Sequence, residues 1–241
     1  MHRIVDDGRQ RDRPAFAEAS AGGASSFGTL GLFCGGRSGR VLGMAKDGFY
    51  FLAPLLLAAA AAFYWGWTWA GMALLPLALF VAYFFRDPRR TIPTDPGAIV
   101  SPADGKVIRI DEVEGGSNVC IFLSVFDVHV NRAPIGGRIA SQEHRPGKFL
   151  LAFDDRASVE NEQLRIVIRG EREISFSLIA GLVARRIVPW RKPGDEVERG
   201  DKIGLIRFGS RVDILMPAGC RLAVRKGDRV KGGSSILGHW E

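Results

Sequence analysis

Gly194-Asp195-Glu196-Val197 is repeated 33 residues later as Gly227-Asp228-Arg229-Val230, and each copy leads into a further glycine and a short β-rich run. In both copies an acidic residue stands beside glycine, which is typical of a tight turn that feeds a strand. Ala103-Asp104-Gly105-Lys106-Val107 is a weaker third copy. The repetition predicts a β domain built from two similar halves.

The chain after Arg90 has the composition expected of such a domain. Its prolines indicate extended and turning backbone, and glycines separate short runs rich in β-branched residues. The paired half-motifs resemble those of biotinyl and lipoyl carrier domains, in which two halves interlock. Residues 91–241 are therefore predicted to be mainly β, barrel-sandwich-hybrid-like, with short helices. We expect strands at Lys106–Ile110, Asn118–Val125, Leu164–Ile168, Ile174–Ile179, Ile203–Phe208, Val212–Met216 and Arg221–Val224, and helices near Phe149–Asp154 and Ser158–Gln163.

A long apolar segment precedes this domain. Gly48–Phe85 is a run of 38 residues without a formal charge. One helix of that length would measure roughly 57 Å, whereas a bilayer core is about 30 Å thick. Trp65, Gly66 and Trp67 lie in the middle and favour a turn at a membrane interface, so we predict a membrane-associated helical hairpin over residues 44–90. Flanking lysine and arginines place both ends on the cytoplasmic face of the cell membrane. A buried helix pair in a soluble core is the alternative.

Residues 1–43 differ from both segments. They are rich in Arg, Gly, Ser and Ala with little apolar periodicity, which predicts disorder. Met44 stands just before the segment that can be interpreted, so a translation start at Met44 in place of Met1 is an equal alternative.

The charge and cysteine content limit the partners. A net charge of +7 suits nucleic acid or anionic lipid about equally. The sequence carries no nucleic-acid-binding motif, and the apolar run favours lipid, so nucleic acid is not an expected partner. The three cysteines have no metal-ligand spacing and form no disulfide framework, so no metal site is predicted.

Phe208-Gly209-Ser210, between the two turn copies, is able to carry covalent chemistry. The Ser210 hydroxyl can attack the carbonyl of Gly209 and convert the amide to an ester, and β-elimination then cuts the chain and leaves a pyruvoyl group on residue 210. Such a ketone is a built-in electron sink for reactions of primary amines. Glycine leaves the attack unobstructed and permits a strained turn. The tripeptide alone is unspecific, because Gly-Ser pairs are common in ordinary turns.

Several further blocks stand in a fixed order around this tripeptide. They are Phe84-Phe85-Arg86-Asp87-Pro88, Ser101-Pro102-Ala103-Asp104-Gly105-Lys106-Val107, Asp127-Val128-His129-Val130-Asn131-Arg132-Ala133-Pro134, Pro146-Gly147-Lys148-Phe149, Ala157-Ser158-Val159-Glu160-Asn161-Glu162 and Phe208-Gly209-Ser210-Arg211-Val212-Asp213. The ordered set resembles the short, bacterial and archaeal type of phosphatidylserine decarboxylase proenzyme, over roughly Met44 to Glu241.

This resemblance implies a reaction and its partners. The proenzyme would cut itself into a large chain ending at Gly209 and a small chain, residues 210–241, which stay together as a heterodimer. The covalent pyruvoyl group derived from Ser210 would then convert phosphatidylserine in the membrane to phosphatidylethanolamine and carbon dioxide through a Schiff base. The exact lipid, and whether the protein forms a homo-oligomer, stay open.

The resemblance also implies roles for single residues. Asp104 would orient His129, His129 would act as the base, and Ser210 would attack, as in a protease triad. His129 lies in an alternating run from Phe126 to Asn131, predicted as a strand. Longer family members have a second histidine where this chain has Arg132, so the base is His129 alone or a different group. His144 and Arg132 are weaker candidates for substrate binding.

Two other functions are compatible with parts of the sequence. A non-catalytic carrier or adaptor domain of biotinyl or lipoyl shape on a membrane anchor would need a lysine at the hairpin tip, where this chain has Phe-Gly-Ser-Arg. A membrane-tethered hydrolase could use Ser210, His129 and Asp104 on an external substrate, and its chain would stay intact.

Overall fold

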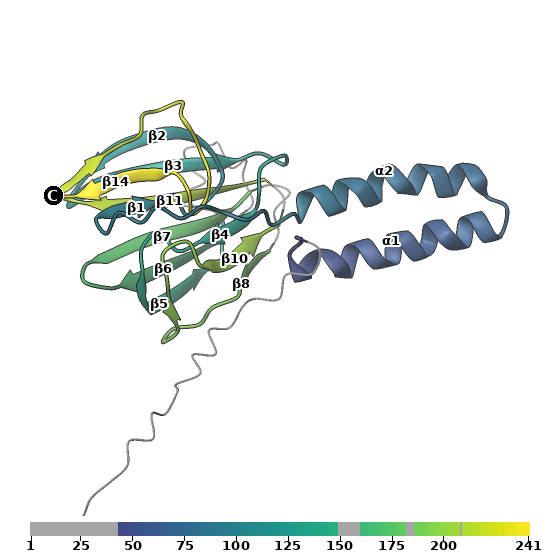
Figure 1. The fold of residues 1–241 in the computed structure, drawn as a ribbon, viewed down its shortest axis with the longest axis horizontal. Helices are drawn as coiled ribbons and strands as arrows, with labels where there is room; N and C mark the ends of the chain where they lie inside the picture. The colour runs from purple at the N-terminus through teal and green to yellow at the C-terminus, as the bar shows by residue number, and fades with distance from the viewer. Residues whose placement is uncertain (1–42, 149–159, 182–185, 208) are drawn as a thin grey trace, which may run out of the picture. The chain divides into compact units, whose positions relative to one another are not determined.

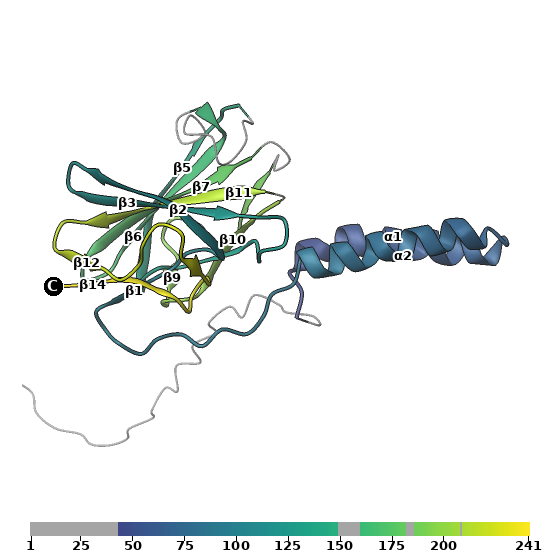
Figure 2. The ribbon, with the colours of Figure 1, turned by 90° about the horizontal axis from the view of Figure 1, so that it is seen from above.

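The computed structural model describes residues 43–148, 160–181, 186–207 and 209–241. Two antiparallel helices come first, α1 (Lys46–Tyr64) and α2 (Thr68–Phe84), which lie side by side in Figure 1 and one in front of the other in the view turned by 90° (Figure 2). They meet at Trp65-Gly66-Trp67, where Gly66 adopts a φ of +77° that favours glycine. The helical hairpin predicted from the uncharged run is therefore confirmed. α1 is long and apolar enough to cross a membrane, and α2 is a shorter apolar helix.

The remainder of the described chain is mainly β, as predicted. The strands are β1 (Ala98–Val100), β2 (Gly105–Val113), β3 (Gly116–Leu123), β4 (Val130–Arg132), β5 (Gly137–Arg145), β6 (Gln163–Arg169), β7 (Glu173–Ala180), β8 (Ile187–Pro189), β9 (Glu196–Val197), β10 (Lys202–Ile206), β11 (Ser210–Pro217), β12 (Cys220–Leu222), β13 (Arg229–Val230) and β14 (Ile236–Trp240).

These strands form three antiparallel sheets that curl around one core (Figure 2). The large sheet has the order β13-β2-β3-β11-β7-β6-β5-β9, and the small sheets have the orders β1-β14-β12 and β4-β10-β8. Isoleucines, valines and leucines from all three sheets fill the core. β11 holds the centre of the large sheet, between β3 and β7.

The repeated turn explains this arrangement. The amide of Gly194 donates to the carbonyl of Ile139 in β5, and the amide of Gly227 donates to the carbonyl of Val107 in β2. In each turn an aspartate two residues before the valine accepts from a main-chain amide three residues earlier. The two copies therefore start β9 and β13, which form the opposite edges of the large sheet.

One local prediction was wrong. The alternating run from Phe126 to Asn131 is not one strand, because the Asp127 carboxylate accepts from the amide and the hydroxyl of Ser124 and closes a turn. β4 begins only at Val130. Of the helix expected near Ser158–Gln163, Glu160 is helical, whereas Asn161 bridges Lys148 and β6 begins at Gln163. The other expected helix lies outside the described residues.

The base of the hairpin packs on the β domain through a second apolar cluster. Phe84 at the end of α2 and Phe85 directly after it are fully buried there against Val128, Val130 and Leu205. Asp47 at the start of α1 accepts from the Trp190 indole and pairs with Arg207, each at 3.1 Å. The hairpin thus contacts β10 and the segment after it, which leads into Gly209 and Ser210.

Candidate active site

Ser210 is the first residue of the central strand β11. Its backbone is in register with Leu123 of β3 and Ala180 of β7, and its side chain lies on the same face as the core residues Val212 and Ile214. The residue is fully buried, and its Oγ has no hydrogen-bond partner among the described residues. A buried hydroxyl is usually paired, so this one has unused capacity to react.

Gly209 gives the bond before Ser210 an unusual conformation. Its φ is +55°, in the left-handed region that glycine enters at little cost. A β-carbon added at this position would meet no atom within 4 Å. The conformation of the chain, rather than crowding by neighbouring residues, is therefore what selects glycine here.

His129 is the second buried group with an unused polar atom. Its Nδ1 lies 2.9 Å from the main-chain carbonyl oxygen of Asp127. Because a carbonyl only accepts, Nδ1 carries the proton of the neutral ring and Nε2 holds the lone pair. Nε2 is buried and has no partner within the described part of the chain. The arrangement supplies a base that points its free nitrogen into a site closed to water.

The surroundings of His129 favour the neutral form. Its ring centroid lies 4.3 Å from that of Phe84 at the end of α2. Burial lowers the pKa of His129 from 6.5 to about 4, against smaller opposing effects from the carbonyl and the carboxylate of Asp127. At neutral pH the imidazole is therefore unprotonated and able to accept a proton.

His129 directly precedes β4 in a small sheet, and Ser210 begins β11 in the large sheet. The carbonyl of His129 accepts from the amide of Ile206 at 3.3 Å, four residues before Ser210. Leu123, which faces Ser210 in the sheet, leads directly into the turn that ends at Asp127. No hydrogen bond joins the two side chains in the described residues, so the predicted base and nucleophile share a region without being in contact.

Asp104 lies in a different set of contacts from those predicted. Its carboxylate accepts two bonds from Arg90, at 2.7 and 2.9 Å, and one from the Gly232 amide at 2.8 Å. Burial raises the pKa of Asp104, whereas Arg90 and the Gly232 amide act to lower it. Within the described residues no hydrogen bond connects Asp104 to His129, whose Nδ1 is held by a carbonyl instead.

The two predicted substrate-binding residues are placed very differently. Arg132 is buried, donating to Asp87 at 2.8 Å and to the Gly200 carbonyl at 2.9 Å, and Lys202 also pairs with Asp87. His144 is exposed on β5 and lies 3.1 Å from Glu162. The register carries His144 across Leu164 and Leu178 to Val212, about 14 Å away across three strand spacings. His144 therefore lies near the end of the sheet that holds Ser210.

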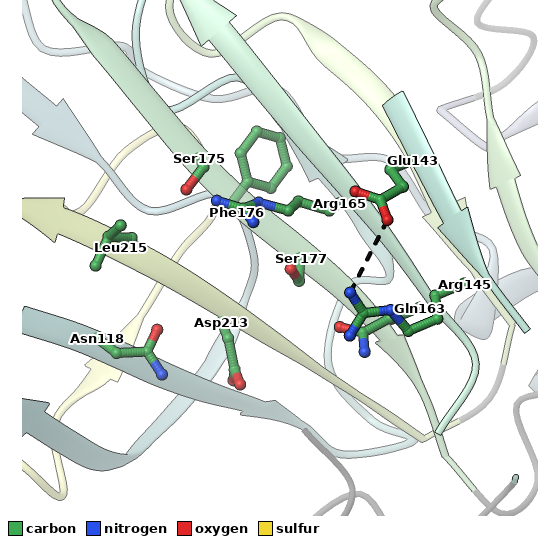
Figure 3. A pocket seen from close by; sticks show the side chains of 10 residues that line it. All are labelled: Asn118, Glu143, Arg145, Gln163, Arg165, Ser175, Phe176, Ser177, Asp213 and Leu215. Atoms are coloured by element: carbon green, nitrogen blue, oxygen red, sulfur yellow. Dashed lines mark ion pairs between the residues drawn. The ribbon is translucent and has the colours of Figure 1, made fainter. Parts of the chain in front are cut away.

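A polar cavity of about 190 Å³ lies on the other face of the large sheet (Figure 3). Asp213 and Leu215 of β11 line it, together with Ser177 and an ion pair between Glu143 and Arg145. Alternation along β11 turns these residues away from the face that carries Ser210. The cavity is therefore separate from the Ser210 site.

Sequence reasoning missed the groups that hold His129 and the segment before Ser210. They are the Asp127 carbonyl, the Phe84 ring, Asp47, Trp190 and Arg207. Most of these contacts join residues more than 40 positions apart, and Asp47 lies 160 positions from Arg207. The only signal was indirect: Phe84 belongs to one of the ordered blocks, and Asp47 is a lone acid before a long apolar run.

Comparison with known proteins gives one consistent answer. The family model described as phosphatidylserine decarboxylase matches residues 77–238. The chain is 46% identical to the phosphatidylserine decarboxylase proenzyme of Symbiobacterium thermophilum, over 81% of this chain and 94% of that protein. It is 47% identical to the proenzyme of Solibacter usitatus over 80% and 95% of the two chains, and 46% identical to that of Zymomonas mobilis over 80% and 85%. The chain belongs to the phosphatidylserine decarboxylase family.

Proposed function

We propose that this carboxy-lyase cuts itself between Gly209 and Ser210 and then decarboxylates phosphatidylserine to phosphatidylethanolamine. Family membership gives the reaction, and the relatives are named as proenzymes. The observation that carries the cleavage site is the buried Ser210 Oγ, which follows a left-handed glycine and has no partner among the described residues.

Self-cleavage needs a base, and His129 is suited to that role. Nε2 takes the proton from Ser210 Oγ, and the oxygen attacks the Gly209 carbonyl carbon, so the peptide bond is replaced by an ester. Loss of the Ser210 α-proton then expels the Gly209 carboxylate and leaves a dehydroalanine. Water then adds to the dehydroalanine and displaces its amino nitrogen as ammonia. Residue 210 thereby becomes a pyruvoyl group. Every atom of the new group comes from Ser210 and water.

The pyruvoyl group supplies an electron sink for the carbon that loses carbon dioxide. The residues around it provide position and a dry environment. Leu123 and Ala180 hold residue 210 between two strands, and Phe84 covers His129. The core face of β11 excludes water, which favours electrostatic effects on developing charge.

The sheet accounts for a heterodimer after cleavage. The small chain would contain β11, β12, β13 and β14. β11 pairs with β3 and β7, β13 pairs with β2, and β14 pairs with β1, all of which belong to the large chain. Separating the two chains would break all of these ladders at once, so the fragments stay together.

Asp104 keeps a positioning role in this proposal. Its bonds to Arg90 and Gly232 connect the segment after α2 to the second repeated turn. Of the two substrate-binding candidates, His144 is exposed at the Ser210 end of the sheet, whereas Arg132 is occupied by Asp87. We therefore assign headgroup contact to His144 and a structural role to Arg132.

The hairpin gives the enzyme access to its substrate. α1 and α2 expose leucines and aromatic residues to their surroundings, as a membrane segment does. Insertion of the hairpin, with Lys46 and Arg89 on the cytoplasmic side, would hold the β domain against the bilayer that contains phosphatidylserine. The first 43 residues are not needed for this proposal.

The intact mass of the purified protein tests self-cleavage. We expect a fragment of residues 210–241 that is about 17 Da lighter than the peptide with an N-terminal serine. Ser210→Ala should give one inactive chain of full mass, and His129→Ala should block cleavage. An active wild-type protein that stays uncut would refute the pyruvoyl mechanism and favour a hydrolase, whereas an uncut inactive protein would favour the carrier domain.

A further inference from the structure

Phe126 is the most exposed large apolar residue in the described part of the β domain. Its side chain is 65% exposed. In the described β domain the only other exposed large apolar side chain is Val113, at 41%. Phe126 lies in the turn that Asp127 closes, three residues before His129. An apolar ring at a loop tip this close to a reactive site indicates contact with an apolar partner.

The turn is fixed to the base of the hairpin. The carbonyl of Phe126 accepts from the Arg86 guanidinium at 2.6 Å and from the Tyr83 hydroxyl at 3.3 Å. Arg86 also lies over the Tyr83 ring at 3.8 Å. Phe126 therefore sits at the level where α2 ends, and any surface that this end of the helix meets is also met by Phe126.

The distribution of aromatic residues shows which surface that is. Trp65, Trp67 and Trp69 are exposed at the hairpin turn, and Tyr50 and Tyr83 are exposed near its two ends. α1 has 19 residues and is about 28 Å long, close to the thickness of a bilayer core. Aromatic side chains at both ends of such a segment are typical of the two membrane interfaces. Tyr83, and Phe126 with it, would lie at the nearer interface.

Charge at this level also suits a membrane. Lys46 precedes the apolar part of α1, Arg89 follows α2, and both are exposed. Arg186 is exposed as well, and its carbonyl accepts from Arg207, which pairs with Asp47 of α1. Exposed cations around an apolar contact are attracted to anionic phospholipids. The occupant favoured by these observations is a bilayer containing anionic lipid.

We propose that the turn of residues 124–127 is a second membrane contact, in which Phe126 enters the headgroup region beside α2. The contact holds His129 and Ser210 at the depth of the lipid headgroup. It rests on the proposed function for the identity of the substrate, and it adds a residue that sets how the site meets the bilayer. Phe126 is a positioning residue, because it is exposed whereas His129 and Ser210 are buried.

Probe depth tests the contact without any use of activity. A fluorophore is attached to Phe126→Cys or, as the matched control, to Val113→Cys, in the full chain with Cys34 and Cys220 replaced by serine. Cys120 is buried and can stay. In vesicles of phosphatidylcholine and phosphatidylserine, nitroxide-labelled lipid should quench the probe at 126 strongly and the probe at 113 weakly. Equal quenching at the two positions would overturn the proposal.

Activity on two substrates gives the second test. Phe126→Ser should cut itself normally, lose about tenfold in rate on phosphatidylserine in vesicles, and keep its rate on a short-chain, water-soluble phosphatidylserine. Val113→Ser should match the wild type on both. An unchanged vesicle rate, or an equal loss on both substrates, would show that Phe126 has no membrane role. A wild-type chain that neither cuts itself nor decarboxylates would instead refute the proposed function, and the quenching test would still report on the contact.

Discussion

The ring of Phe84, the last residue of α2, lies 4.3 Å from the ring of His129, centroid to centroid, at an angle of 35°. Phe84 is fully buried, and His129 is fully buried beneath it. The contact means that a helix expected to reside in the membrane forms one wall of the site expected to perform self-cleavage. The hairpin is therefore a structural part of the site as well as the proposed anchor.

Replacing this wall should change the titration of His129. Phe84→Leu keeps most of the apolar volume but removes the ring face, so water gains access and the pKa of His129 should rise from about 4 toward its ordinary value. The measurement is an NMR titration of His129 in the uncut Ser210→Ala protein. Phe80→Leu is the control, because Phe80 contacts Phe84 one turn earlier and has no ring contact with His129 among the described residues. Equal shifts in both variants would contradict the assignment.

The low pKa of His129 should also make the stability of the protein depend on pH. The pKa of His129 is about 4 in the folded protein and near 6.5 when unfolded. Between these values the unfolded chain binds more protons than the folded protein. The contribution of His129 to the free energy of unfolding is therefore complete above pH 6.5 and is lost as the pH falls toward 4. The contribution is about 3 kcal/mol in the limit.

Chemical unfolding of Ser210→Ala between pH 4 and pH 8 measures this contribution. His129→Gln in the same background should flatten the curve between pH 4 and 6.5. Because His129 stays neutral above about pH 5, the cleavage rate of the wild type should not decline between pH 8 and pH 6. A decline centred near pH 6.5 would show that the base is an ordinary, solvated histidine.

The sequence predicted those features that follow from local pattern. The repeated Gly-Asp turns fix the same hydrogen bonds to Val107 and Ile139 at opposite edges of one sheet, which a repeat is able to reveal. The uncharged run with its central Trp65-Gly66-Trp67 predicted the hairpin, because one straight helix of that length would be much longer than a bilayer core is thick. The sequence also assigned cleavage to Gly209 and Ser210, where the structure has a left-handed glycine and a buried hydroxyl, and the cleavage itself stays a prediction.

The sequence did not predict contacts that arise only on folding. Asp104 was expected beside His129, but Arg90, 14 positions earlier, takes its carboxylate. The alternation from Phe126 to Asn131 was typical of a strand, yet one Asp127–Ser124 turn outweighs it. A local sequence pattern does not show which side chain forms a hydrogen bond with a given carboxylate. These two contacts could therefore not be predicted from the sequence.

The Asp47 contacts should make the hairpin necessary for efficient self-cleavage. Asp47 pairs with Arg207, three residues before Ser210, and also accepts from the Trp190 indole. Asp47→Asn keeps an oxygen for Trp190 but removes the charge that holds Arg207, so the segment before Gly209 gains freedom. We expect cleavage to slow about five- to tenfold, because partly buried ion pairs contribute about 1 kcal/mol and geometry sets the attack.

The time course of fragment release measures the effect of Asp47→Asn. Glu173→Gln is the control, since Glu173 forms an exposed pair with Arg169 far from the site in sequence and in the sheet. Asp47→Ala removes both contacts and should be slower still. Unchanged cleavage in both Asp47 variants would show that the hairpin anchors the enzyme without shaping its site.

Glycine at position 209 can be required for its backbone conformation or for the space that it leaves at the proposed cleavage site, and substitution separates these two reasons. A methyl group there meets open space, so Gly209→Ala is disfavoured mainly by its φ of +55°, which costs about 1 to 2 kcal/mol for a residue with a β-carbon. We expect the variant to fold and to cut itself about 5 to 30 times more slowly. If the methyl group instead obstructs the attacking hydroxyl, the chain will fold with little loss of stability and stay uncut.

Gly105→Ala is the contrasting case, because its β-carbon would collide with the Phe122 carbonyl in β3, and it should fail to fold. Thermal unfolding and fragment release, measured together on the two variants, decide between conformation and obstruction.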